Sequence, residues 1–289
     1  MFLPDIQTAL LDLLSKVDSP DIKLIIGGGY GIYLRAELAR KSEERTLFKE
    51  WPEVRSTNDL DLFLRPELLI NSSQLKPLVK ALNILGYSPV PGAENYQFSR
   101  AGSDSAITGL FKIDILTGPK DCFKDTPVKV DARRVRPRPS VGIHAHPTDE
   151  AVTLEKGLQP IILKGKLSSS EFYEAEIFLP HCYTFLMMKL FAFKDRFHDR
   201  NKEYGRYHAL DMYAILATTK EEEWKQALEL RDEHADKEFV VEAGKLINQY
   251  FTSNDQFGII RLKENRYYRG EMQLDSFISA LQELFPFKS

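Results

Sequence analysis

The residues best suited to chemistry in this 289-residue sequence are aspartates on segments predicted to be β-strands. Asp59 and Asp61 alternate with leucines along residues 56–64. Side chains alternate between the faces of a strand, so both carboxylates point to one side, about 7 Å apart, while the leucines point into a core. Two carboxylates held side by side repel each other unless a cation lies between them. The spacing therefore predicts a divalent metal that carries a polyphosphate.

A third carboxylate lies on a later apolar segment, residues 110–116, where Lys112, Asp114 and Leu116 share one face of a predicted strand. If this strand neighbours the first one in a sheet, Asp59, Asp61 and Asp114 converge on one metal site. Mg²⁺, or Mn²⁺, suits such a site because both ions prefer oxygen ligands and keep substrate phosphates in their coordination shell.

A glycine cluster precedes these strands. The apolar run Leu24–Ile26 predicts a buried strand that ends in Gly27, Gly28 and Gly29, and an amphipathic helix is predicted over 30–41. Free backbone N–H groups at the start of that helix can bind phosphate. The glycines are equally explained by a tight turn that needs positive φ. With the three aspartates, the turn predicts a nucleotidyl-transfer site.

Composition predicts a globular protein with a substantial core, since 43% of the residues are hydrophobic and 28% are charged. The formal net charge of −3 does not indicate a nucleic-acid binder, although local basic patches stay open. Two cysteines without metal-like spacing predict a reducing compartment. No apolar run approaches the ~20 residues that span a bilayer, so we expect a cytoplasmic protein with no membrane partner.

The pattern along the chain predicts an α+β first half and a helical second half. Helices are expected over 5–17, 30–41 and 71–85, a long loop over 41–55, and strands near 96–98, 161–163 and 172–179. Beyond Pro180 helices are predicted near 181–199, 206–218, 220–233, 236–251, 254–264 and 271–285. This division predicts a first domain over 1–180 and a helical domain over 181–289.

Other motifs carry two interpretations each. His144 and His146 are spaced for a zinc ion, but no further ligands have recognisable spacing. The basic run of Arg133, Arg134 and Arg136 can engage RNA phosphates or can form a solvated hairpin edge. Two loop arginines, Arg45 and Arg55, can close on a triphosphate or can be merely exposed.

The combination of motifs resembles the polymerase-β-like nucleotidyltransferase superfamily. The resemblance lies in Gly28-Gly29, in Asn58-Asp59-Leu60-Asp61-Leu62 and in Lys112-Ile113-Asp114-Ile115-Leu116. The later segments 177–180, 186–192 and 208–213 are similar to AbiEii-type nucleotidyltransferases, many of them toxins of bacterial toxin–antitoxin pairs. The resemblance runs from about residue 22 to residue 216.

This resemblance implies a mixed-sheet minimal nucleotidyltransferase core with a helical C-terminal domain. It implies that Asp59 and Asp61 are metal ligands and that Asp114 is a third ligand or the base for the acceptor hydroxyl. Lys189 would contact the triphosphate, and Asp211 would orient Lys189 or the helix around it. The chain departs from the pattern at Tyr30, where many members have Ser or Thr, so phosphate binding must depend on backbone N–H groups and cations.

The leading hypothesis is metal-dependent transfer of a nucleoside monophosphate from an NTP to a hydroxyl of a macromolecule, such as tRNA or a protein. A toxin role with an antitoxin partner accompanies it. One alternative is a small-molecule, antibiotic-type nucleotidyltransferase. Another is an inactive binding module that keeps the fold, which the tyrosine at position 30 motivates.

Overall fold

The chain divides into two compact units. A computed structural model describes residues 3–17, 19, 22–53, 59–93, 95–101 and 110–287. The first unit comprises residues 1–31, 56–149 and 158–180, and the second comprises 32–55, 150–157 and 181–289. One boundary follows Pro180, where the sequence predicts one, but two earlier segments also belong to the second unit.

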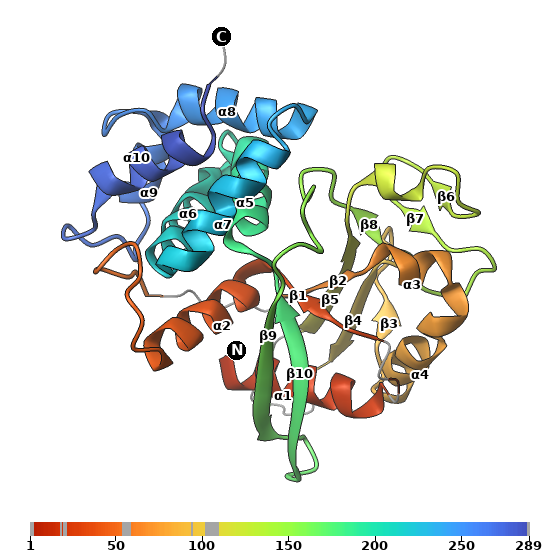
Figure 1. The fold of residues 1–289 in the computed structure, drawn as a ribbon. Coiled ribbons are helices and arrows are strands. Elements are labelled where there is room, and N and C mark those ends of the chain that lie inside the picture. Colours follow the sequence, from red (N-terminus) through yellow and green to blue (C-terminus); the bar gives the residue numbers. More distant parts are fainter. Residues whose placement is uncertain are drawn as a thin grey trace. The chain divides into compact units, whose positions relative to one another are not determined.

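The first unit is built on an eight-stranded mixed sheet in the order β3-β4-β5-β2-β1-β10-β9, with β8 pairing with β5 (Figure 1). The pairs β1–β10, β2–β5 and β5–β8 are parallel and the other pairs are antiparallel. The strands are β1 (Ile25–Ile26), β2 (Asp59–Leu64), β3 (Ser88–Pro89), β4 (Gln97–Ala101), β5 (Leu110–Thr117), β8 (His146–Pro147), β9 (Gln159–Lys166) and β10 (Phe172–Leu179). A separate hairpin joins β6 (Lys129–Val130) to β7 (Val135–Arg136).

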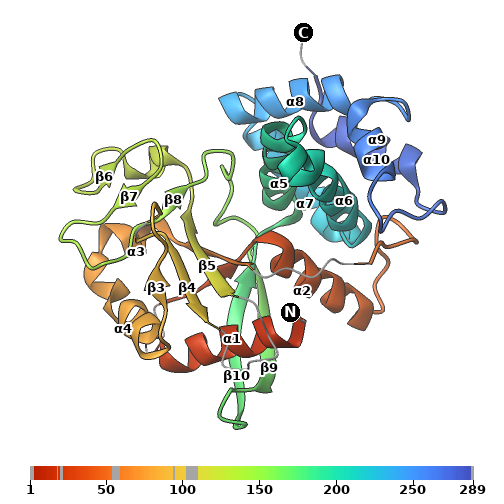
Figure 2. The same ribbon diagram turned by 180° about the vertical axis from the view of Figure 1, so that it is seen from behind.

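Apolar faces account for this sheet. Leu60, Leu62 and Leu64 are buried as the alternation predicts. Helix α1 (Leu3–Lys16) packs on β9 and β10 through an apolar stripe that includes Leu10 and Leu13 (Figure 2).

The prediction of a single helix over 71–85 is wrong in its first turn. The chain instead forms α3 (Pro66–Ile70), a 3₁₀ turn η1 (Ser72–Leu75) and α4 (Lys76–Ile84). Pro77 lies in the first turn of α4. A proline inside a longer helix would lack one hydrogen bond and clash with the preceding turn, so the helix begins beside it.

The second unit is helical. Helix α2 (Gly28–Lys41) starts in the first unit and enters the second after Gly31. The remaining elements are α5 (Cys182–Arg196), η3 (Arg200–Gly205), α6 (Arg206–Ala217), α7 (Glu221–Glu233), α8 (Glu238–Tyr250), α9 (Phe257–Lys263) and α10 (Leu274–Leu284). Helix α5 contacts α6, α7 and α8. It is buried on every side over most of its length, as expected for a central helix.

The loop predicted over 41–55 is well anchored to the second unit where it is described. Its Leu47 N–H donates to the Thr219 carbonyl at 2.9 Å, and the Tyr213 hydroxyl donates to the Glu50 carbonyl at 3.2 Å. The Phe48 ring lies 5.3 Å from that of Tyr213. The segment is therefore attached to the helices of the second unit, with Phe48 buried among them.

The predicted α+β class, with a mixed sheet and a helical C-terminal part, is confirmed. Among the described helices, none is long and apolar enough to cross a membrane.

Candidate active site

Two aspartates lie side by side on neighbouring central strands of the first unit. In the parallel pair β2–β5, Asp61 lies opposite Asp114 and Asp59 lies opposite Lys112. Neighbouring strands are about 4.8 Å apart, and residues in register point to the same face. One face of the sheet therefore carries three carboxylates and one ammonium group, and the adjacency that the sequence left conditional is present.

The glycine turn closes directly on Asp61. The Gly27 N–H donates to the Asp61 carbonyl at 2.9 Å, and Gly28 has a φ of +60°. A Cβ on Gly28 would lie 2.0 Å from Asp61 Oδ2, so a glycine is required both by the backbone conformation and by the space. The N-terminus of α2 is thus beside the carboxylate face, where its N–H groups and dipole favour anions.

Tyr30 takes no part in the surface of this turn. Its side chain is completely buried, and its hydroxyl oxygen is buried as well. Any phosphate at the turn would therefore meet backbone N–H groups, as the sequence predicts.

Asp114 is electrostatically strained. Burial, followed by the nearby charges of Asp61 and Asp59, raises its pKa to about 7, against the opposing effects of a Gln97 hydrogen bond and the Lys112 charge. Its Oδ1 is buried and has no hydrogen-bond partner among the described residues. A buried acceptor without a donor is costly. A divalent cation would supply the missing partner and relieve the repulsion, so the residues fit such an ion.

The three aspartates are not a closely packed triad. Over the described ranges, a single set of three ligand-type side chains, His181, Cys182 and Glu223, has ligand atoms that all lie within 4.8 Å of one another. The aspartates are spread over two registers of the sheet, and Asp59 is exposed. Asp61 and Asp114 are therefore the adjacent pair, and Asp59 lies two residues, or about 7 Å, further along β2.

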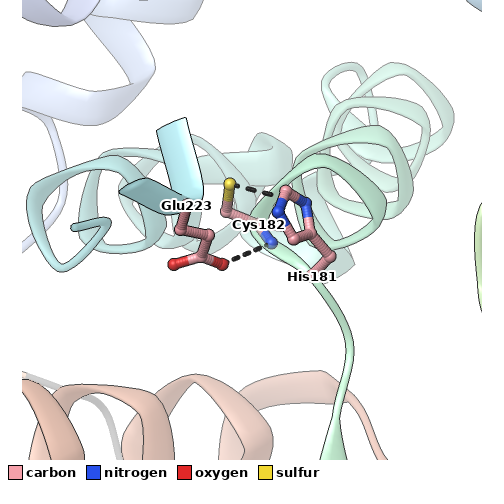
Figure 3. A group of neighbouring side chains, drawn as sticks. All are labelled: His181, Cys182 and Glu223. Atoms are coloured by element: carbon pink, nitrogen blue, oxygen red, sulfur yellow. Dashed lines mark hydrogen bonds between the residues drawn. The ribbon is translucent and has the colours of Figure 1, made fainter. Parts of the chain in front are cut away.

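The set of His181, Cys182 and Glu223 lies in the second unit and is drawn in Figure 3. Both Glu223 oxygens accept from the Arg35 guanidinium, at 2.7 and 2.5 Å, and Oε1 also accepts from the Cys182 N–H at 2.9 Å. His181 Nδ1 accepts from the Tyr183 N–H at 3.2 Å.

This chemistry is unsuited to a metal. Burial has the largest effect on the pKa of the Cys182 thiol: it raises the pKa well above the ordinary value, so the thiol stays neutral. A metal needs a thiolate, and it would have to displace a buried guanidinium of the same charge sign. The set instead caps the N-terminus of α5 and joins it to α2 and α7.

Lys189 and Asp211 form a buried ion pair between α5 and α6 of the second unit. Lys189 Nζ donates to Asp211 Oδ2 at 2.7 Å, and both side chains are less than a tenth exposed. The structure thus brings these two residues together. Contact of Lys189 with a triphosphate stays a prediction.

Other candidates from the sequence fall outside this face. Arg45 is exposed in the second unit, and Arg55 and Asn58 lie outside the described residues. His144 and His146 belong to no three-ligand set within the described ranges.

Sequence reasoning missed Gln97, which lies opposite Asp114 on β4. β4 and β5 are consecutive antiparallel strands, and it is their register that brings Gln97 opposite Asp114. Lys112 was visible in the alternation of its own strand, but its position opposite Asp59 was not.

Comparison with known proteins adds one weak likeness. No family model matches the sequence, and no curated protein matches it. Among solved structures, the solution structure of the antibiotic-resistance factor ANT(2'')-Ia is similar, with 14% sequence identity and a TM-score of 0.32; the match covers 80% of this chain and 99% of that chain. The case for function therefore rests on the residues of the chain itself.

Proposed function

We propose that this protein is a metal-dependent nucleotidyltransferase that moves a nucleoside monophosphate from an NTP to a hydroxyl acceptor. The observation that carries the proposal is the pair Asp61–Asp114, which is in register on neighbouring parallel strands beside the Gly28 turn. A buried, unpartnered oxygen and a pKa of about 7 at Asp114 support a site built for cations.

Asp59 and Asp61 would hold Mg²⁺ or Mn²⁺, and Asp114 would be a third metal ligand or the base for the acceptor hydroxyl. The chemistry supplied by divalent cations there is neutralisation of the triphosphate and activation of the attacking oxygen. The backbone N–H groups at the start of α2 would bind phosphate oxygens through the Gly28–Gly29 turn.

In the reaction, the acceptor oxygen forms a bond to the α-phosphorus, and the bond from that phosphorus to the bridging oxygen breaks. Pyrophosphate leaves with the bonding electron pair. Where Asp114 is the base instead of a third metal ligand, it accepts the proton of the hydroxyl. Positioning and charge stabilisation, with little covalent chemistry, provide the acceleration.

Transfer of label tests the proposal. The purified protein is incubated with Mg²⁺ and each NTP labelled at the α-phosphate, and the acceptor is total RNA, lysate protein or a panel of small hydroxyl compounds. We expect label in one acceptor class, its loss on chelation, and a decrease of at least about 100-fold in Asp61→Asn, since the metal and its charge stabilisation are lost. Absence of transfer to all three classes, or full activity of Asp61→Asn, would refute it.

The same experiment distinguishes the acceptor classes. The resemblance to AbiEii-type proteins favours a macromolecule, with a toxin role and an antitoxin partner. Growth arrest on expression of the wild-type chain in bacteria, absent with Asp61→Asn, is the expected sign of a toxin. Label in a small compound alone would assign the antibiotic-type alternative, and any turnover would remove the inactive-module alternative.

A further inference from the structure

The hairpin β6–β7 of the first unit is a local concentration of positive charge. Residues 129–138 carry five basic side chains and one acidic side chain, in a chain whose net charge is −3. The basic residues are Lys129, Arg133, Arg134, Arg136 and Arg138, and the acidic one is Asp131. Figure 1 shows the hairpin beside β8, and the pairing of Val135 with Ala145 joins the two segments.

Asp131 organises the turn of this hairpin. Its Oδ1 accepts from the backbone N–H groups of Arg133 and Arg134 at 3.0 and 2.9 Å. Its Oδ2 accepts from Arg136 at 2.8 Å and lies 3.7 Å from Arg134 Nε. The backbone hydrogen bond from Arg133 is the largest of the effects that lower the pKa of Asp131. In the part of the chain that the structure describes, the exposed Arg133 guanidinium has no ion-pair partner.

A pocket of about 460 Å³ lies between this turn and the chain before β4. We call it the hairpin pocket, and it is lined by Gly92, Tyr96, Asp131, Ala132, Arg133 and Arg134. The Tyr96 ring lies 5.8 Å from that of His146, at a tilt of 39°. His146 Nδ1 donates to the Arg133 carbonyl at 2.8 Å, so a single histidine holds both the aromatic wall and the arginine wall.

The hairpin pocket is joined through the backbone to β5, the strand that carries Asp114. The Tyr96 carbonyl accepts from the Ile115 N–H at 2.7 Å, next to Asp114, and Gln97 is in register with Asp114. His146 of β8 is in register with Leu116 of β5, and Leu116 lies two residues, or about 7 Å, from Asp114 along that strand. In the sheet order the pocket is on the β4 side of Asp114, whereas the Gly28 turn is on the β1 side.

We propose that the hairpin pocket binds a nucleotide next to the 3′ end of a single-stranded polynucleotide acceptor. Tyr96 stacks on a base, and Arg133 and Arg134 bind the neighbouring phosphate. This inference rests on the proposed function, in which the acceptor hydroxyl lies beside Asp61 and Asp114. A volume of this size accommodates a nucleotide. An aromatic face combined with guanidinium groups is the usual means of binding single strands.

Charge argues against the other acceptor classes at this pocket. A cationic small molecule would be repelled by Arg133 and Arg134, and an unmodified protein hydroxyl brings neither a phosphate nor a base. RNA and DNA share the base and the phosphate, so both strands are used in the test.

The test measures binding without NTP, by fluorescence anisotropy of labelled single strands of about 12 nucleotides at salt concentrations from about 50 to about 200 mM. Arg133→Gln should weaken binding about tenfold and reduce the salt slope by about 0.7, the contribution of one phosphate contact. Arg133→Lys should retain most of the slope. Tyr96→Leu should weaken binding about tenfold with an unchanged slope, and Tyr96→Phe should bind as the wild type does.

Arg138→Gln is the matched control. It removes the same charge as Arg133→Gln does, and Arg138 is exposed on the same segment but does not line the pocket. We expect a change of less than about twofold for this variant. Equal weakening by Arg133→Gln and Arg138→Gln, or wild-type binding by Tyr96→Leu, would overturn the proposal in favour of a solvated basic surface. Thermal melts establish that each variant is folded.

The two proposals fail separately. If the variants behave as expected but no label is transferred to the strands, the nucleotidyltransferase function fails and the binding site stands. If strands are labelled and Tyr96→Leu and Arg133→Gln leave their KM unchanged, the function stands and the hairpin pocket is not the acceptor site.

Discussion

At the scale of single residues, the pair Asp61–Asp114 is costly to the folded protein in the absence of a cation. Burial and the charges of Asp61 and Asp59 raise the pKa of Asp114 to about 7. The unfolded chain loses this proton near pH 4, whereas the folded metal-free protein keeps it until about pH 7. Between these values the native state binds more protons than the unfolded state, so stability falls as pH rises.

Asp114→Asn removes this dependence. The quantity to compare is the free energy of unfolding of the variant minus that of the wild type, measured in the presence of a chelator. We expect this difference to rise by on the order of 2 kcal/mol between pH 5 and pH 8. Urea denaturation at several pH values measures the difference. Parallel profiles for the two proteins would contradict the pKa of Asp114, and added Mg²⁺ should stabilise only the wild type at pH 8.

Gly28 provides a second residue-scale prediction. Gly28→Ala adds a Cβ at positive φ and 2.0 Å from Asp61 Oδ2, so it should both strain the backbone and displace the carboxylate. We expect the free energy of unfolding to fall by about 2 kcal/mol. We also expect Mg²⁺ to stabilise this variant less than it stabilises the wild type. Thermal melts with and without Mg²⁺ measure both.

Gly86→Ala separates the two effects. Gly86 has a φ of +74°, but a Cβ there would meet nothing within 4 Å. This variant should lose only about 1 kcal/mol and keep its response to Mg²⁺. An identical response of the two variants to Mg²⁺ would contradict the close contact of Gly28 with the Asp61 carboxylate.

At the scale of elements, local pattern predicts what local forces decide. The alternation in β2 and the apolar periodicity of α8 and α10 are sufficient to predict these elements, because each buries one face or stripe. The break between η1 and α4 required the effect of Pro77 on a single turn. The register of Asp61 with Asp114 depends on parallel pairing between distant segments, and that of Gln97 with Asp114 depends on the register of two consecutive antiparallel strands; a single segment encodes neither.

The ion pair between α5 and α6 supports a prediction at this scale. Lys189→Met would remove the ammonium group that pairs with the buried Asp211 carboxylate, so we expect a loss of about 3–5 kcal/mol of stability. In the double variant Lys189→Met/Asp211→Leu the apolar replacements should restore most of that stability.

Nucleotidyl transfer by the double variant then reports on the role of Lys189. If Lys189 contacts the triphosphate, as the family resemblance implies, the double variant is folded but inactive. Stability and label transfer are measured on the same samples. Recovery of both would show that the pair serves only to hold the helices together.

At the scale of the whole molecule, the second unit is assembled from distant parts of the chain. Arg35 joins α2 to Glu223 of α7 and also donates to Thr218 and Thr219, at 3.2 and 2.9 Å. Residues 150–157 contribute too, because Thr153 and Thr184 are linked by a hydrogen bond of 2.7 Å. The domain limits 1–180 and 181–289 are based on the composition of the chain. The contacts instead group residues 32–55, 150–157 and 181–289 in the second unit.

A fragment of residues 181–289 should therefore fail to fold on its own. It would leave Glu223 without the Arg35 guanidinium and Tyr213 without its Glu50 and Phe48 contacts. Breaking a buried pair alone costs about 3–5 kcal/mol, which is comparable with the stability of a small domain. We expect a melt without a cooperative transition and a poorly dispersed NMR spectrum. A fragment in which residues 32–55 are joined by a flexible linker to 150–157 and 181–289 restores these contacts and should melt cooperatively; a cooperative melt of 181–289 alone would show that the helical domain is independent of them.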